Sequence, residues 1–300
     1  MAISITPLAK SKGGGSPYVT PGQTTPAAMK YLCVVVLTQD DDSAPAFTGL
    51  TDNKGNNFGP ALFTGAIGGN DQVIRVFGKA NAVGGAGHTF SVQSTGGDID
   101  CAVLPCYLSS PQDIAFDQVA SGGTGYRGSP FSLGSISVAG AKTGLALGVV
   151  CAGYQGTTVT YTPTNGFTVG DSYNDPLVTW PAYEAFIGAY MGLPFTQSAT
   201  TTYTGSVSVK NAENNQEVGA ATASALLTFV EVVTGPQITN VDGDDVITST
   251  QQNVIVNGSG FGSSQGASLL QIVQGSVVKD QTSIDSWGNT QIQFDVTFDT

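Results

Sequence analysis

His88 is the one histidine of the chain, so a hydrolytic triad would have to be built around it. Such a site needs a nucleophile beside the imidazole, and in many hydrolases that nucleophile stands in a Gly-x-Ser-x-Gly turn. No turn of this kind accompanies His88, which stands in Gly-His-Thr-Phe at the expected start of a strand. We therefore interpret His88 as a polar or packing residue.

A pair of carboxylates could hydrolyse a glycosidic bond. Glu184 is the best candidate because Tyr183 and Phe186 flank it in an expected strand. No second acid takes a partner position on a strand, so the sequence predicts no catalytic residue and no enzyme. A glycosidase that acts through Glu184 is kept as a third hypothesis. The other acids considered stand in expected turns: Asp40, Asp41, Asp42, Asp52, Asp71, Asp113, Asp171 and Asp175.

Metal and cofactor sites also have few candidates. Zinc sites use Cys-x-x-Cys or paired histidines, and the chain has neither. Calcium ligands could come from Asp40–Asp42 or from Asp242, Asp244 and Asp245, but neither cluster has the alternating acids of an EF-hand loop. The Gly-rich segments 13–15 and 122–125 have no phosphate-loop lysine. The prediction is solvated acidic turns, with no metal and no cofactor.

The four cysteines are Cys33, Cys101, Cys106 and Cys151, and most of their neighbours in the sequence are apolar. We interpret them as small buried side chains in a reducing compartment. Cys101 and Cys106 are an odd number of residues apart, so a straight strand would place them on opposite faces. Aromatic residues in polar segments could stack on sugars. These aromatic candidates are Tyr126, Phe131, Tyr154, Tyr161, Tyr173 and Trp180.

The composition limits the possible partners. The net charge is −12, and the ten basic residues are scattered along the chain. Binding to nucleic acid or to an anionic membrane needs clustered Lys and Arg, so neither partner is expected. The N-terminus shows no basic segment followed by an apolar one, and the longest apolar run, near 145–152, is too short to span a bilayer. We expect synthesis in the cytoplasm without a signal peptide.

Strands must position these side chains, because no long window has the apolar period of a helix. The segments 30–38 and 145–154 are nearly continuous apolar runs, which predicts central strands covered on both faces. The expected fold class is all-β, with roughly ten to twelve strands before residue 233 at the spacing of a sandwich or barrel. The expected domains are an N-terminal arm (1–29) with a flexible Gly run, a sandwich (30–234) and a smaller sandwich (235–300).

The C-terminal segment 235–300 alternates apolar and polar residues between turns. In 253–262, Val254 and Val256 are expected to face one way, and Phe261 follows a Gly-Ser-Gly corner that suits a ring tucked into a core. Ile292, Phe294 and Val296 form the expected buried face of a last strand. Together with 236–241 and with Ser286-Trp287, these pieces resemble the immunoglobulin-like IPT/TIG domain of plexins and some transcription factors.

The larger segment carries a second resemblance. A Thr-Asp-x-x-Gly-Asn turn (51–56) is followed by Gly-His-Thr-Phe-Ser-Val, by Cys-Ala-Val-Leu-Pro (101–105) and by Gly-Leu-Ala-Leu-Gly-Val-Val (144–150). The last strand is Ala-Ser-Ala-Leu-Leu-Thr-Phe (223–229). In this order the patterns resemble a jelly-roll-like sandwich that recurs in tailed-phage structural proteins and some bacterial surface proteins.

These resemblances imply a non-enzymatic structural protein of a tailed-phage virion, displayed on the particle surface. Head decoration is the first hypothesis, with assembly through the sandwich edges and the N-terminal arm. The alternatives are a collar, tail-fibre or tail-tip appendage, or an adhesin that binds host carbohydrate. The expected partners are capsid or tail subunits, further copies of this chain and, for an adhesin, a host surface glycan. A stiff joint at Gly235-Pro236 is expected to set the angle of the C-terminal module.

Overall fold

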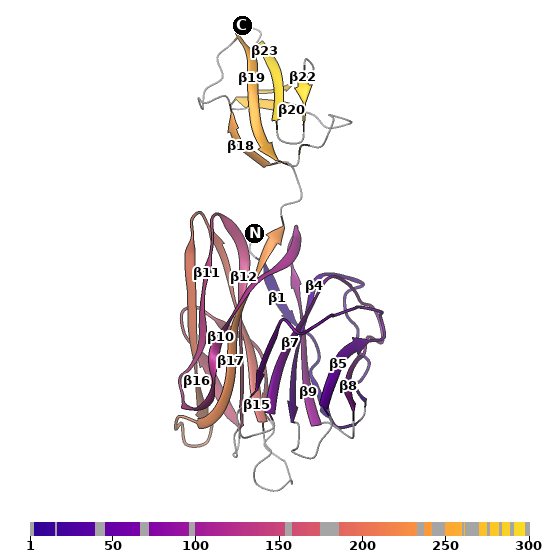
Figure 1. Ribbon diagram of the computed structural model, residues 1–300, viewed down its shortest axis with the longest axis vertical. Helices are drawn as coiled ribbons and strands as arrows, with labels where there is room; N and C mark the ends of the chain where they lie inside the picture. Colours follow the sequence, from indigo (N-terminus) through magenta and orange to yellow (C-terminus); the bar gives the residue numbers. More distant parts are fainter. Residues whose placement is uncertain are drawn as a thin grey trace. The chain divides into compact units, whose positions relative to one another are not determined.

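The computed structural model describes residues 3–15, 17–39, 46–66, 72–95, 100–153, 158–174, 186–232, 237–241, 250–259, 261, 270–274, 277–281, 284–288 and 291–297. The chain divides into two compact units, Met1–Val232 (unit 1) and Val233–Thr300 (unit 2). Every regular element among the described residues is a β-strand, and the strand pairs are antiparallel (Figure 1). The prediction of an all-β protein is therefore confirmed. The expected joint at Gly235-Pro236 lies outside the described residues.

The first half of unit 1, residues 3–109, forms two sheets. Sheet I has the order β1-β9-β4-β7-β6, and β2 pairs with β9. Sheet II has the order β3-β8-β5. The strands are β1 (Ser4–Pro7), β2 (Ser11–Gly13), β3 (Tyr18–Val19), β4 (Ala28–Gln39), β5 (Ala46–Asp52), β6 (Phe63–Ala66), β7 (Gln72–Val83), β8 (Phe90–Thr95) and β9 (Asp100–Ser109).

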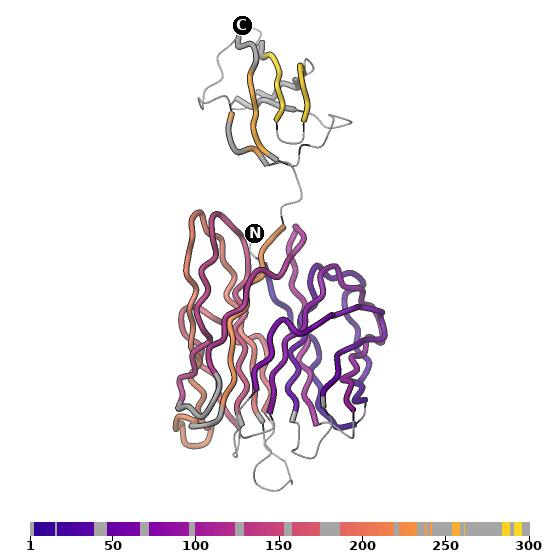
Figure 2. Tube along the Cα trace, in the orientation of Figure 1, coloured from indigo at the N-terminus to yellow at the C-terminus, as the bar shows by residue number. Residues whose placement is uncertain are grey.

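The second half, residues 113–232, also forms two sheets. Sheet III has the order β10-β17-β12-β15-β14, and sheet IV has the order β11-β16-β13. The strands are β10 (Asp113–Gly128), β11 (Phe131–Val138), β12 (Lys142–Gly153), β13 (Val159–Pro163), β14 (Thr168–Asn174), β15 (Phe186–Gln197), β16 (Thr201–Asn211) and β17 (Gly219–Val232). Figure 2 traces the two halves, the first in indigo and purple and the second in magenta to orange.

The two halves have the same strand order. If β2 is set aside, each half has eight strands, which can be numbered 1 to 8 along the chain within that half. In both halves the larger sheet has the order 1-8-3-6-5 and the smaller sheet has the order 2-7-4. Thus β10 corresponds to β1, and β14 corresponds to β6. The described strands therefore form two sandwiches of eight strands, where the sequence patterns suggested a single sandwich over 30–234. A shared strand order depends on which strands pair, and local sequence patterns do not record pairing.

Alternating burial along the central strands explains how four sheets stack. In β4, Leu32, Val34 and Val36 belong to the apolar core between sheets I and II. Cys33 and Val35, with Tyr31 and Leu37, belong to the core shared by sheets I and III. In the same way, β12 contributes to that shared core on one face and to the core between sheets III and IV on the other. The apolar segments 30–38 in β4 and 145–154 in β12 are thus central strands with two covered faces where they are described, as predicted.

The N-terminal segment differs from the expected arm. Ser4–Pro7 pairs with β9, Ser11–Gly13 also pairs with β9, and Tyr18–Val19 pairs with β8. The Gly run therefore begins within a strand, because Gly13 pairs with Cys101. The expectation of a flexible Gly run in an arm outside the sandwich is wrong for the described residues, since the open edge of β9 binds them through backbone hydrogen bonds.

Unit 2 has a small core of its own. Val254, Val256, Phe261, Ile292 and Phe294 are its buried members, while Ile255 and Asn257 are partly exposed. The Trp287 indole nitrogen donates a hydrogen bond to the Phe261 carbonyl at 2.8 Å. The prediction that these five side chains face the core is therefore confirmed. The side chain of Val296, which was expected to join them, lies outside the described part.

The strands of unit 2 form a sheet in the order β18-β19-β23-β22 and a separate β20-β21 pair. They are β18 (Gln237–Val241), β19 (Thr250–Ser259), β20 (Leu270–Gln274), β21 (Val277–Gln281), β22 (Ile284–Trp287) and β23 (Gln291–Thr297).

Candidate functional site

His88 lies in a buried polar network between two side chains from other parts of the first half. Its Nδ1 is 3.0 Å from the Thr25 hydroxyl, and its Nε2 is 2.9 Å from Oδ2 of Asp52. Thr25 precedes β4 and Asp52 ends β5, so the imidazole connects two segments that are distant in sequence. The side chains of His88 and Asp52 have no solvent exposure.

Asp52 is held by further hydrogen bonds. Its Oδ1 accepts from the backbone N–H groups of Lys54 and Asn56, at 3.1 and 2.9 Å. The Asn56 amide donates to Oδ2 of Asp52 and also to the Val83 carbonyl. A buried carboxylate is stable only when it is hydrogen-bonded in this way. The network therefore fixes the turn after β5 against the segments around β4 and β7.

The Thr-His-Asp order has the connectivity of a catalytic triad but lacks access to a substrate. Thr25 is 4% exposed and His88 is fully buried, so no substrate carbonyl can approach the hydroxyl. The Thr25 hydroxyl also accepts a hydrogen bond from the Gly85 N–H at 3.0 Å. We therefore assign the network a structural role, consistent with the interpretation of His88 as a polar residue in the packing.

Three of the expected turn acids lie among the described residues. The expected turn positions are wrong for these three, since Asp52 ends β5, Asp113 begins β10 and Asp171 lies within β14. Asp52 is buried, while Asp113 and Asp171 form ion pairs with Lys30 and Lys10 at 2.7 and 2.8 Å. The described part of the chain contains no group of three His, Cys, Asp or Glu side chains that could hold a metal ion. The remaining candidates lie outside the described residues: Asp40, Asp41, Asp42, Asp71, Asp175, Glu184, Asp242, Asp244 and Asp245.

The four cysteines are free and buried. Cys101 belongs to the core between sheets I and II and Cys106 to the core between sheets I and III, so they lie on opposite faces of β9 as predicted. Cys106 lies directly across from Cys33 of β4. A hydrogen bond with Cys33, together with burial, raises the pKa of the Cys106 thiol. Burial raises the pKa of Cys101 and of Cys151 to about 12, so these thiols are poor nucleophiles.

Several of the aromatic candidates pack into cores. Phe131 is 1% exposed and Tyr173 is 6% exposed. Tyr161 is partly buried, and its hydroxyl is 3.4 Å from the Tyr173 carbonyl. The side chain of Tyr126, together with Tyr154 and Trp180, lies outside the described residues.

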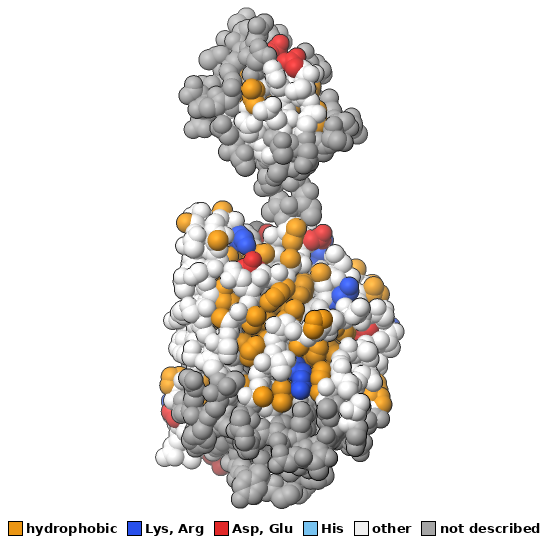
Figure 3. Space-filling model, in the orientation of Figure 1, with side chains coloured by type: hydrophobic (Ala, Val, Ile, Leu, Met, Phe, Trp, Pro, Cys, Tyr) orange, Lys and Arg blue, Asp and Glu red, His pale blue; other side chains and the backbone are white. Residues whose placement is uncertain are grey.

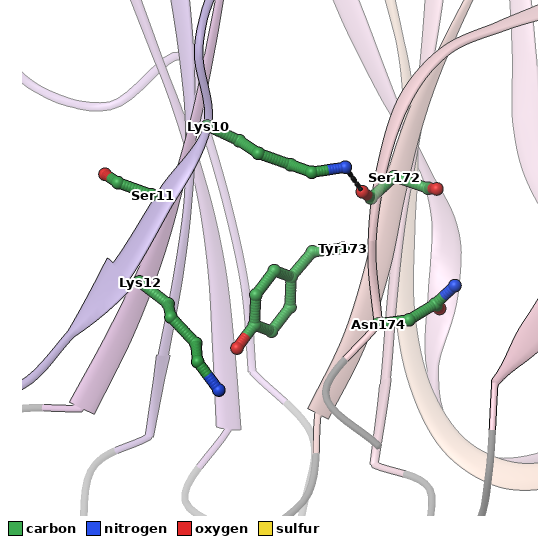
Figure 4. A pocket seen from close by; sticks show the side chains of 6 residues that line it. All are labelled: Lys10, Ser11, Lys12, Ser172, Tyr173 and Asn174. Atoms are coloured by element: carbon green, nitrogen blue, oxygen red, sulfur yellow. Dashed lines mark hydrogen bonds between the residues drawn. The ribbon is translucent and has the colours of Figure 1, made fainter. Parts of the chain in front are cut away.

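A cleft of about 280 Å³ lies between β2 of the first half and β14 of the second. Figure 4 shows Lys10 and Lys12 extending from one side and the Tyr173 ring pointing between them from the other. The Lys10 ammonium donates to Oδ1 of Asp171 at 2.8 Å and to the Ser172 carbonyl at 2.5 Å. The full lining is Lys10, Ser11, Lys12, Ser172, Tyr173 and Asn174.

Sequence reasoning missed this cleft, although Tyr173 had been considered as an aromatic candidate. Its two sides are about 160 residues apart in the chain, and only the packing of sheet I on sheet III brings them together. The spacing Lys-Ser-Lys was the available signal, because alternate residues of a strand share a face. That signal alone did not indicate what lies opposite.

A second hollow, of about 310 Å³, lies beside the turn after β5 and is lined by residues 50–52 and 55–58. Its one acidic group is Asp52, whose side chain is buried and already hydrogen-bonded. The β2/β14 cleft is therefore the better candidate for a ligand site, since Lys10 has a side chain that is 44% exposed.

Comparisons with known proteins leave the chain unplaced: no family model, no curated protein and no solved structure matches it. Among the described residues, no helix is long and apolar enough to cross a membrane.

Proposed function

We propose that the protein is a structural component of a tailed-phage virion, displayed on the particle surface, with head decoration as its first role. The observation that carries the proposal is the repeated strand order of unit 1. We interpret the order 1-8-3-6-5 in the larger sheet and 2-7-4 in the smaller sheet of each half as jelly-roll-like. Jelly rolls are frequent in viral capsid and lectin domains.

The packing of unit 1 supports a scaffold role. Sheets I and III share an apolar core that includes Val35, Leu104, Leu147 and Phe229, all of them almost completely buried. Such an interface makes the two halves one rigid body that can present loops and strand edges to other subunits. The N-terminal strands β1 and β2 belong to sheet I and β3 belongs to sheet II, so we propose attachment through the edges of the sandwiches.

Unit 2 fits an accessory module. Its core of Val254, Val256, Phe261, Ile292 and Phe294 lies within one sheet and its flanking segments, and we propose that it is immunoglobulin-like, of the IPT/TIG kind. Immunoglobulin-like domains serve as spacers and as binding modules, so the fold alone does not assign a role to unit 2. The proposed accessory role rests on the resemblance and on the proposed place of the protein on the particle.

The test is to measure the protein in purified particles by quantitative mass spectrometry, with the major capsid protein as the internal reference. Decoration predicts many copies that remain with heads after tails are removed. A few copies per particle would identify a collar or tail appendage instead. If the protein is abundant in the infected-cell lysate but missing from purified particles, the proposal is wrong.

A further inference from the structure

The packing of sheet I on sheet III creates two seams along their edges. On one seam β6 lies beside β10, and on the other β1 lies beside β14. Because β14 corresponds to β6 and β10 corresponds to β1 in strand order, the two seams occupy equivalent places in the repeat. β2 has no counterpart in the second half, so what it adds beside β14 is particular to the first half.

The β6/β10 seam is apolar. Leu62, Phe63 and Phe116 are partly buried there and pack against the core between sheets I and III. Figure 3 shows apolar side chains gathered across the face of unit 1 on which β10 crosses in Figure 1. Side chains thus fill this seam.

At the other seam, Ile5 of β1 and Tyr173 of β14 pack against the same core, and a hollow lies beside them between β14 and the added strand β2. Lys10 and Lys12 stand at alternate positions, so both ammonium groups extend over the cleft, and Ser11 points the other way (Figure 4). Asp171 and the Ser172 carbonyl hold the Lys10 ammonium in place. Two of the ten basic residues of a chain with net charge −12 therefore stand at one cleft.

The cleft offers groups for more than a simple anion. β14 pairs with β15 on one side, and among the described strands no other strand pairs with its outer edge. The Ser172 carbonyl points outward from this edge, since it accepts from Lys10. Lysines often protect an open edge from unwanted pairing, but they do so from the edge strand itself, whereas Lys10 and Lys12 come from the opposite side.

We propose that the β2/β14 cleft binds a saccharide that carries a carboxylate. The ammonium groups bind the carboxylate, and the backbone groups at the edge of β14 exchange hydrogen bonds with sugar hydroxyls. The volume is just below the range of about 300–1,000 Å³ that small-molecule sites occupy, which suits one sugar residue at a time. The choice of a saccharide as the ligand rests on the proposed display of the protein on a particle surface.

The experiment measures binding to the full-length chain by titration calorimetry and by amide chemical shifts, with glucuronic acid, glucose and inorganic phosphate as separate probes. We expect glucuronic acid to bind at least about fivefold more tightly than glucose, the effect of one exposed charge pair. Shift changes should concentrate at residues 10–12 and 172–174. Lys12→Gln should weaken glucuronic acid binding by about fivefold and leave glucose binding unchanged.

The matched control is Lys210→Gln, which removes a lysine that is ion-paired to Glu217 and lies on β16 of sheet IV. It should bind glucuronic acid as the natural chain does. The proposal is overturned if glucose binds as tightly as glucuronic acid, if phosphate binds as tightly, if Lys12→Gln in its folded form has unchanged affinity, or if glucuronic acid does not bind. Binding by a protein that is missing from particles would overturn the virion role and leave this site in place.

Discussion

His88 should contribute strongly to stability, because its fully buried side chain connects Thr25 and Asp52. His88→Ala removes the partner of the buried Asp52 carboxylate and of the Thr25 hydroxyl. Leaving a buried charge short of a partner costs about 3 kcal/mol. We expect the free energy of unfolding, measured by urea denaturation, to fall by that amount.

A substitution near the same turn provides the control. Lys54 donates its ammonium group to the Ala86 carbonyl at an exposed position, so Lys54→Ala should change the free energy of unfolding by no more than about 0.5 kcal/mol. Equal effects of the two substitutions would show that the buried network is not what fixes this turn.

The buried thiols should make stability depend on pH in the alkaline range. Burial raises the pKa of Cys151 from 9.0 to about 12. Between these values the thiol ionises in the unfolded chain but stays protonated in the native one, so the free energy of unfolding falls as pH rises above about 9. Each such thiol contributes a slope of up to about 1.4 kcal/mol per pH unit.

Urea denaturation from about pH 8 to about pH 10.5 tests this slope. Cys151→Ala should lower stability at every pH because it leaves a cavity, but its alkaline slope should be shallower than that of the natural chain. Parallel curves for the two proteins would contradict the assignment. The natural chain should also resist a thiol reagent near neutral pH until denaturant exposes its four cysteines.

Two glycines at strand irregularities differ in their surroundings. Gly122 is the extra residue of a bulge in β10, and a Cβ atom there would overlap the Ser132 carbonyl oxygen of β11. Gly49 flanks a similar bulge in β5, and a Cβ atom there would meet nothing within 4 Å. The close approach of β10 to β11 therefore requires glycine at position 122. Position 49 has room for a side chain.

Gly122→Ala should accordingly lower the free energy of unfolding by about 2 kcal/mol, the usual effect of overpacking. Gly49→Ala should change it by about 0.5 kcal/mol or less. Thermal and urea denaturation of the two variants give the comparison. A stable Gly122→Ala variant would mean that β11 can move away from β10 at little cost.

The shared core makes unit 1 behave as one folding body. Leu147 of β12 is fully buried in the core between sheets I and III, and Leu→Ala at such a site costs about 3 kcal/mol. Because Val35 of β4 belongs to the same core, Leu147→Ala should reduce hydrogen-exchange protection in β4 as much as in β12.

Hydrogen exchange read by mass spectrometry can separate the two outcomes. Loss of protection confined to residues 113–232 would show that the halves open independently. Val119→Ala on β10 is the control, because this side chain is 40% exposed and its removal should affect neither half.

The sequence by itself determined the fold class, the two central strands and much of the core of unit 2. These features depend on local patterns: an unbroken apolar run indicates two covered faces, and alternation indicates one. The described residues before 233 form the seventeen strands β1–β17, where ten to twelve were expected. Polar strands account for part of the difference: β16 buries little more than Gly205, Val207 and Val209 between Thr and Ser side chains that face outward. Strand pairing stabilises such polar segments, and pairing is not visible in the local pattern.

Only the tertiary structure decided that unit 1 consists of two sandwiches with one strand order, that His88 meets Thr25 and Asp52, and that Lys10 and Lys12 stand opposite Tyr173. Each of these arrangements joins segments that are distant along the chain. The physical reason is that backbone pairing and sheet packing choose partners by the fit of whole faces, while a sequence pattern records only which face of its own strand is apolar.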